Sequence, residues 1–174
     1  MMDVSWDETF MGAAYLIANK SHDTNTKIGA VIVAPDMTFT SWGYNGLPRG
    51  VSYREEILVA PEKYKWMCHA EENAIYNAHR GGKSVIGHHM YVNLLPCNIC
   101  ARAITQNNIA EVIVHKNSHE FYMESSGKDE NYWKESFECT REMFSETGTR
   151  LRWLDYQLVM PAGYFNGQVF PAPH

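Results

Sequence analysis

Two short motifs constrain this chain more than any other feature, because their side chains suit a single metal ion. The motifs are His69-x-Glu71 and Pro96-Cys97-x-x-Cys100, which together supply one imidazole, two thiols and one carboxylate. Zinc held by only three protein groups keeps its fourth position open for water, as in catalytic sites, whereas structural zinc is closed by four Cys or His ligands. A carboxylate that is not needed as a ligand remains. The pattern therefore predicts an enzyme.

Both motifs lie where a helix is expected to begin. Residues 69–80 are rich in Ala, Glu and Asn and end at a Gly-Gly pair, and Pro96 suits the start of a second helix that reaches about residue 106. Thiols at a helix N-terminus ionise readily, because the first-turn N–H groups and the helix dipole favour the thiolate that zinc requires. Positions i and i+2 do not share a helix face. His69 and Glu71 are therefore expected to act together from the helix end.

The remaining pattern predicts an alternation of strands and helices. We expect helices over residues 5–20, 69–80, 96–106 and 130–146, and strands over residues 28–33, 38–42, 90–95, 111–115 and 151–154. Such alternation favours a sheet covered by helices, with the metal ligands where the chain passes from strand to helix. Residues 46–65 lack periodicity, and so long an irregular segment is typical of a functional loop. We expect this loop to border the active site.

The composition excludes several classes of protein. A chain of 174 residues suits one compact domain, and its net charge of −5 gives no overall attraction to a polynucleotide. No apolar run approaches the roughly 18 residues that span a bilayer, and the first eight residues carry acids where a signal peptide carries Lys or Arg. Four cysteines are few for a disulfide framework. We expect a soluble, cytoplasmic protein with no membrane partner.

A third motif, Gly-Tyr-Asn-Gly-x-Pro at residues 43–48, joins the first two. With all three, the chain resembles the cytidine and deoxycytidylate deaminase superfamily from about residue 5 to residue 153. The pair H-x-E and P-C-x-x-C is the established signature of zinc deaminases, and the third motif points to their deoxycytidylate (dCMP) deaminase branch. The resemblance implies an α/β, three-layer, cytidine-deaminase-like fold, in which a central mixed five-stranded sheet is flanked by helices.

The resemblance also implies the reaction, which is zinc-dependent hydrolysis of dCMP to dUMP and ammonia, supplying dUMP for thymidylate synthesis. His69, Cys97 and Cys100 match the ligands of one catalytic Zn²⁺ per chain, and Glu71 matches the proton shuttle. Substrate contacts are implied at Asn25, Asn45, Ala70, Lys116 and Tyr122. In regulated members of the family, dCTP activates and dTTP inhibits the enzyme, with Mg²⁺. The resemblance therefore implies that Gly43, Tyr44 and Gly46 contact these effectors.

The same resemblance implies a homo-oligomer, often a hexamer. Residues 1–154 are expected to form the deaminase domain, and residues 155–174 an extension of it. That extension holds several prolines and aromatic residues and is either an arm that packs on a neighbouring subunit or a loosely ordered terminus.

Other interpretations remain open. The substrate could extend to dCTP or to a base in a polynucleotide, although the chain lacks a basic stripe interleaved with aromatic residues. A non-catalytic zinc module is a further alternative, but a structural site has no use for the free carboxylate of Glu71. Cys68 adjoins a ligand and is expected to be a small buried residue instead of a fourth ligand.

Overall fold

A five-stranded mixed sheet forms the centre of the computed structural model, which describes residues 4–125, 130–155, 163–165 and 168–170. The strand order is β2-β1-β3-β4-β5; β1 is antiparallel to both neighbours, and β3, β4 and β5 are parallel. The strands are β1 (Gly29–Val33), β2 (Phe39–Tyr44), β3 (His89–Val92), β4 (Glu111–His115) and β5 (Arg150–Leu154). The sheet confirms the predicted fold class.

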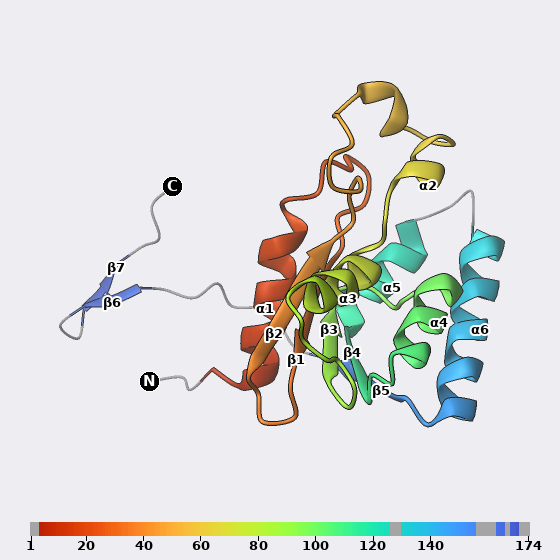
Figure 1. The fold of residues 1–174 in the computed structure, drawn as a ribbon. Coiled ribbons are helices and arrows are strands. Elements are labelled where there is room, and N and C mark those ends of the chain that lie inside the picture. The colour runs from red at the N-terminus through yellow and green to blue at the C-terminus, as the bar shows by residue number, and fades with distance from the viewer. Residues whose placement is uncertain (1–3, 126–129, 156–162, 166–167, 171–174) are drawn as a thin grey trace.

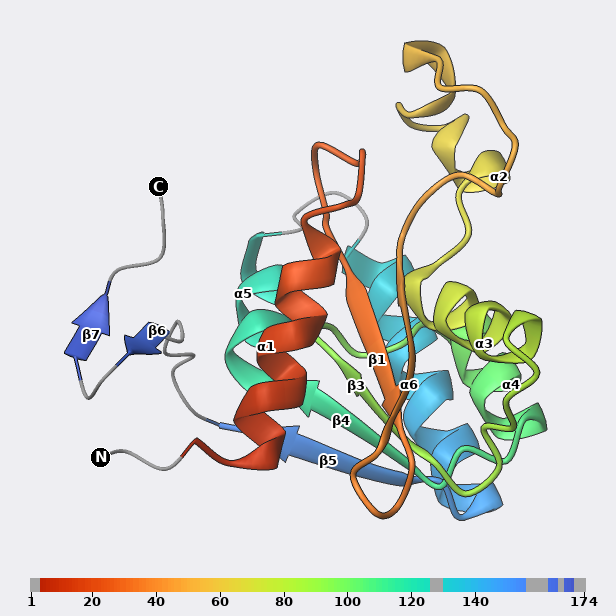
Figure 2. The same cartoon turned by 60° about the vertical axis from the view of Figure 1, so that its left-hand side comes forward.

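Helices cover both faces of the sheet (Figure 2). They are α1 (Trp6–Ala18), α2 (Lys63–Trp66), α3 (Ala70–Arg80), α4 (Asn98–Gln106), α5 (Lys116–Ser125) and α6 (Glu130–Thr147). Alternate residues of β1 explain the layers, because successive side chains of a strand point to opposite faces. Ala30 and Ile32 join the core beneath α3, α4 and α6, whereas Val31 and Val33 join the core beneath α1. The continuous apolar run of β1 is thus buried on both sides.

Two glycines let helices approach the sheet closely. A Cβ atom at Gly29 would lie 2.0 Å from the carbonyl oxygen of Ala14 in α1, and one at Gly43 would lie 2.3 Å from that of Ala70 in α3. Neither position has room for a side chain. The close approach at Gly43 places the first turn of α3, which carries the H-x-E motif, directly against β2.

Most predicted elements are confirmed, with shifted ends. The predicted start of the second helix at Pro96 is wrong, since α4 begins at Asn98 with Cys97 as its N-cap. The predicted strand 90–95 stops at Val92, because the side-chain amide of Asn93 replaces the backbone ladder: its Oδ1 accepts from the Gly29 N–H at 3.0 Å and its Nδ2 donates to the Lys27 carbonyl at 3.1 Å.

Helix α5 was not predicted. Its apolar residues, Phe121, Tyr122 and Met123, are consecutive in sequence, so they give no helical period. The Tyr122 ring instead packs edge-on against Trp133 and Phe137 of α6, with ring centroids 6.2 and 6.5 Å apart. Tertiary packing of this kind overrides a weak local pattern.

The irregular segment after β2 leaves the sheet and returns to it at one point. Gly46 and Cys68 form an isolated antiparallel bridge, with N–H to carbonyl distances of 3.0 and 2.9 Å. Between them the chain makes a 3₁₀ turn (Glu55–Ile57) and the short helix α2, at the top of Figure 1. Because Cys68 precedes His69, both ends of the excursion lie beside the H-x-E motif, where this loop was expected.

Part of the predicted C-terminal extension lies outside the described residues. Its described parts are Asp155 and two strands, β6 (Gly163–Phe165) and β7 (Gln168–Phe170), which pair antiparallel as a separate two-stranded sheet. Among the residues that the structure describes, no helix combines the length and the apolar character that crossing a bilayer requires.

Candidate active site

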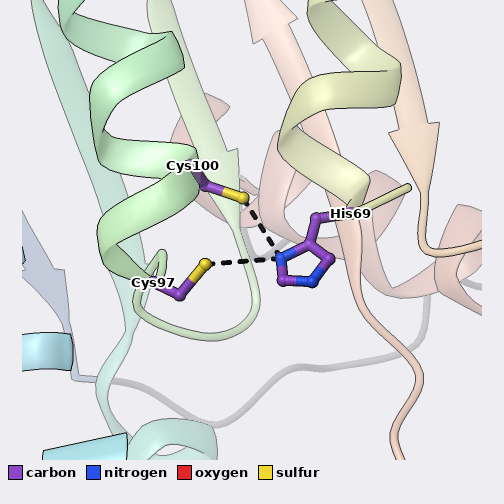
Figure 3. Close-up of side chains that lie close together, drawn as sticks. All are labelled: His69, Cys97 and Cys100. Carbon is purple, nitrogen blue, oxygen red and sulfur yellow. Dashed lines mark hydrogen bonds between the residues drawn. The ribbon is translucent and has the colours of Figure 1, made fainter. Parts of the chain in front are cut away.

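The two sequence motifs meet at the N-termini of α3 and α4 (Figure 3). His69 is the N-cap of α3, Cys97 is the N-cap of α4, and Cys100 lies in the first turn of α4. The Nδ1 atom of His69 is 3.4 Å from the Cys97 Sγ and 3.3 Å from the Cys100 Sγ. In the described part of the chain, these form the one group of three or more metal-ligating side chains whose ligand atoms all lie within 4.8 Å of one another.

The geometry of the three side chains fits zinc. Tetrahedral bonds of about 2.0 Å to nitrogen and about 2.3 Å to sulfur place those two atoms about 3.5 Å apart. The nitrogen–sulfur separations of 3.4 and 3.3 Å are close to that value. One imidazole and two thiols are also a donor set that zinc favours. The residues can therefore hold the ion through His69 Nδ1 and both sulfur atoms.

Glu71 lies beside this cluster without belonging to it. It occupies the first turn of α3 and is 4 % exposed. Since His69 is an N-cap with extended backbone (φ −76°, ψ 160°), the helical i, i+2 opposition does not separate the two side chains. Burial raises the pKa of Glu71 to about 7, with the His69 imidazole opposing this shift. A carboxyl group with such a pKa can both accept and release a proton near neutrality.

The thiols are also perturbed in the metal-free site. A hydrogen bond from Cys100, helped by one from His69, lowers the pKa of Cys97 to about 4. The same hydrogen bond, together with burial, raises the pKa of Cys100. The hydrogen bond to Cys97 also raises the pKa of His69 to about 9. One thiolate thus already faces an imidazolium, and a bound cation would take the place of the protons that the three groups share.

Glu72, which the sequence motifs did not single out, contacts the backbone of the metal ligand His69 at the start of α3. The Glu72 carboxylate accepts from the backbone N–H of His69 at 3.2 Å. This contact helps to satisfy the helix N-terminus while the His69 ring faces the thiols. The spacing of three residues between N-cap and glutamate is a capping-box signal, and it could have identified Glu72.

The loop that carries the predicted substrate contacts is firmly anchored. Asn45 is 9 % exposed, and its side chain joins two backbone groups of the neighbouring loop, accepting from the Ile28 N–H at 2.8 Å and donating to the Thr26 carbonyl at 2.9 Å. Asn25 is exposed on that loop, and its backbone N–H donates to Asp23 Oδ1 at 2.8 Å. Both contacts stay predictions.

A buried ion pair ties this loop to the excursion after β2. The Lys63 Nζ in α2 lies 2.7 Å from the Asp23 Oδ2, and both side chains are under 10 % exposed. Asp23 uses its other oxygen to hold the backbone of Asn25 and Thr26. The pair therefore connects two loops that flank the H-x-E motif.

The other predicted substrate residues have different neighbours. Ala70, the first residue of α3, is fully buried. Lys116 forms an ion pair of 2.7 Å with Asp155, and Tyr122 packs on aromatic rings of α6. Cys68 is half-buried, less than expected, and is not part of the ligand cluster. The roles of Ala70, Lys116 and Tyr122 stay predictions.

The predicted effector residues have structural roles that the sequence did not indicate. Gly43 lets α3 pack closely against β2, and Gly46 forms a β-bridge with Cys68. The Tyr44 carbonyl accepts from the Asn73 side chain at 2.8 Å. Three successive contacts of the Gly-Tyr-Asn-Gly motif thus hold the start of α3.

The family model described as the cytidine and deoxycytidylate deaminase zinc-binding region matches residues 4–116 of this chain. The chain belongs to this family. An uncharacterised deaminase from the luxG 3′ region of Aliivibrio fischeri is 32% identical over 154 residues, a match that covers 88% of this chain and 97% of that protein. The family assignment agrees with the ligand cluster and with the unliganded Glu71.

Deoxycytidylate deaminases are among the relatives of this deaminase-family chain. The human enzyme is 42% identical over 118 residues, which cover 63% of this chain and 64% of the human protein. The match thus spans less than two-thirds of the length of that relative. The crystal structure of the dCMP deaminase from cyanophage S-TIM5 in complex with dCMP and dUMP superposes with a TM-score of 0.65 at 20% identity, covering 88% of this chain and 100% of that one. That likeness shows the shared fold.

Proposed function

We propose that this protein hydrolyses dCMP to dUMP and ammonia, and so supplies dUMP for thymidylate synthesis. The observation that carries the proposal is the buried, unliganded carboxyl group of Glu71 beside three ligands that fit zinc. A purely structural zinc site would leave such a carboxyl group without a use. The identity to human deoxycytidylate deaminase supports dCMP as the substrate.

His69, Cys97 and Cys100 would hold one Zn²⁺ per chain. When bound, the ion lowers the pKa of a water molecule so that hydroxide becomes available near neutrality. Three protein ligands leave one position for that water. The positive ends of α3 and α4 both face the site, and they favour the ionised thiols that the ion requires.

Glu71 moves the protons of the reaction. Its carboxylate accepts a proton from the attacking water and delivers it to the ring nitrogen N3 of cytosine. The hydroxyl group then bonded to C4 gives its proton through the same carboxylate to the amine. The bond between C4 and that nitrogen breaks, ammonia departs and the oxygen remains as the C4 carbonyl of dUMP. Burial, which raises the pKa of Glu71 in the metal-free site, favours a carboxyl group that can also carry a proton.

Substrate recognition falls to the residues around this centre. We assign the sugar contact to Asn45, a phosphate or sugar contact to Asn25, and a substrate contact to Ala70. We assign the phosphate to Lys116 and stacking to Tyr122. The anchored loops of Asn25 and Asn45 beside the H-x-E motif support the first two assignments. Lys116 would have to exchange its Asp155 partner for the phosphate.

Regulation and assembly extend the proposal. We infer effector binding by dCTP and dTTP, with Mg²⁺, at Gly43, Tyr44 and Gly46. Gly43 and Tyr44 contact α3, and Gly46 pairs with Cys68 next to His69, so these contacts connect the effector residues to the metal ligand. We also infer a homohexamer, with residues 155–174 as an arm between subunits. Thiols bind zinc only while reduced, which supports a cytoplasmic location for the free Cys97 and Cys100.

The test is ammonia release from dCMP, dCTP, cytidine and a single-stranded oligonucleotide by the zinc-loaded protein, with metal-stripped protein as the blank. Preferential turnover of dCMP is expected. Preference for cytidine would show that the phosphate is not recognised, and activity on the oligonucleotide alone would make the protein a polynucleotide deaminase. Zinc binding without turnover of any substrate would leave a non-catalytic zinc module.

A further inference from the structure

Both helices that meet at the metal site have a ligand where a capping residue normally stands. N-cap positions favour Ser, Thr, Asp and Asn, because their side chains bond to first-turn N–H groups that lack partners within the helix. Here the N-caps are His69 and Cys97, and the side chain of Cys97 makes no capping hydrogen bond. Glu72 assists α3. The start of α4 therefore needs partners from elsewhere.

Helix α6 supplies those partners through two hydroxyl groups. The Ser136 Oγ accepts from the backbone N–H of Asn98 at 3.0 Å, and the Thr140 Oγ1 donates to the carbonyl oxygen of Pro96 at 2.9 Å. These two backbone groups belong to the peptide units on either side of Cys97. Holding both peptide planes fixes φ and ψ of Cys97, and so fixes the direction in which its side chain leaves the backbone.

The two hydroxyl groups are buried and belong to one helix. Ser136 is 4 % exposed and Thr140 is fully buried. Spaced by four residues, they share one face of α6, which packs along α4 (Figure 1). The Thr140 hydroxyl also lies 3.1 Å from the Ser136 carbonyl within its own helix, the longer of its two contacts. A buried hydroxyl aimed at another element acts as a positioning group.

We propose that Ser136 and Thr140 are positioning residues of the metal site, and that they hold the Pro96–Asn98 turn so that the Cys97 thiol faces His69 Nδ1. This inference rests on the proposed zinc site. Neither residue lies within residues 4–116, where the family model matches, so α6 adds a support for the ligands from outside that region. Groups that orient metal ligands without touching the metal typically contribute 10- to 100-fold to metal affinity.

The test compares zinc affinity in four variants of the full chain, measured by competition with a chromophoric chelator. Thr140→Val keeps the shape of the side chain but removes its hydroxyl, Thr140→Ser keeps the hydroxyl, and Ser136→Ala removes the other one. We expect Thr140→Val and Ser136→Ala each to weaken zinc binding about 10-fold or more, and Thr140→Ser to stay within about 3-fold of wild type. Thr147→Val is the control, since its hydroxyl lies at the C-terminal end of α6, where it donates to the Met143 carbonyl at 2.7 Å and lies 3.4 Å from the Thr149 hydroxyl, and it has no contact with the Pro96–Asn98 turn.

A second measurement separates positioning from a loss of stability. Cobalt(II) replaces zinc in such sites and reports its sulfur ligands through a thiolate charge-transfer band. We expect Thr140→Val and Ser136→Ala to shift or weaken this band at a temperature where the metal-free variants remain folded by circular dichroism. Thr147→Val is expected to leave it unchanged.

Two results would overturn the inference: unchanged zinc affinity and an unchanged cobalt spectrum in Thr140→Val and Ser136→Ala, or an equal loss in Thr140→Ser. Failure of the proposed function would look different. In that case the wild-type protein would bind zinc but release no ammonia from dCMP, and the affinity differences among the variants would still be measurable.

Discussion

The metal site and a second charged region shift the pKa values of their carboxyl groups in opposite directions. The second region, here named the distal ion cluster, consists of Asp7, Glu111 and Arg152 beneath the start of α1. The Arg152 guanidinium lies 2.5 and 2.9 Å from the two carboxylate oxygens of Asp7, and its Nε lies 3.4 Å from Glu111. The hydrogen bond to Arg152 lowers the pKa of Asp7, and Asp7 in turn raises the pKa of Arg152. Both groups become more firmly charged.

At the metal site the pKa shifts favour groups that can exchange protons. Burial brings the pKa of Glu71 up to about 7, and the pKa values of Cys97 and Cys100 move apart. A shifted pKa alone therefore does not mark a reactive site. A shift that holds a group in its usual ionised state is typical of a structural contact, whereas a shift toward the working pH favours chemistry.

Removing a metal ligand should produce the largest loss of activity, and the loss should be specific to cysteines at the metal site. We expect Cys97→Ala to lose both bound zinc and ammonia release from dCMP, because two ligands cannot hold the ion as three do. Metal analysis beside the activity assay would show this. Cys139→Ala, at an exposed position of α6, is the matched control and should keep both. Full zinc content in Cys97→Ala would contradict the ligand assignment.

The buried pair of Lys63 and Asp23 should matter next, because it lies on the side of the metal site. Lys63→Met leaves the Asp23 carboxylate buried without its partner, and we expect it to lower the free energy of unfolding by about 3 kcal/mol. We also expect KM for dCMP to rise more than kcat falls, since Asp23 holds the loop of Asn25.

Lys65→Met is the matched control for that change. Lys65 also lies in α2 and forms an ion pair of 2.7 Å with Glu62, but this pair is largely exposed. Its loss should cost about 0.5 kcal/mol or less in urea unfolding. Equal losses in the two variants would show that the Lys63–Asp23 pair has no special role.

A change in the distal ion cluster should affect stability and leave catalysis alone. We expect Arg152→Met to lower the free energy of unfolding by about 1–2 kcal/mol, a value reduced because the pair is about one-third exposed. Urea denaturation measures this cost, and kcat for dCMP should stay within about 2-fold of wild type. Arg150→Met, at a more exposed arginine 3.6 Å from Glu111, is the control and should cost less. A large fall in kcat would erase the distinction between the regions.

The smallest expected effect is a pH dependence of the same cluster. The hydrogen bond to Arg152 holds the folded pKa of Asp7 below its ordinary value. The ion pair therefore stabilises the protein fully above the unfolded pKa and loses this contribution as the pH falls through the folded pKa. The stability difference between metal-free wild type and Asp7→Asn should therefore be constant near about pH 6 and shrink below about pH 4. A difference that grows as the pH falls would contradict the direction of the shift.

The sequence predicted the reactive residues of the site better than the residues that hold them in place. The metal ligands and Glu71 carry strong spacing signals, and the alternating apolar pattern predicted four helices and the five strands of the sheet. Asp23 and Lys63 are 40 residues apart, and nothing local to either residue indicates that they pair. Ser136 and Thr140 likewise read as ordinary helix residues, because their partners lie in another element. Contacts of this kind depend on tertiary packing, which a local pattern does not encode.

The central claim is that Glu71 moves protons at a site that binds zinc without it. Its most direct test measures bound zinc and ammonia release from dCMP in zinc-loaded wild type and Glu71→Gln. We expect the two proteins to contain equal amounts of zinc. We expect kcat to fall about 10²- to 10⁴-fold in the variant, which is the usual contribution of a general acid–base group. Near-wild-type turnover by Glu71→Gln would contradict it, as would loss of zinc together with the activity.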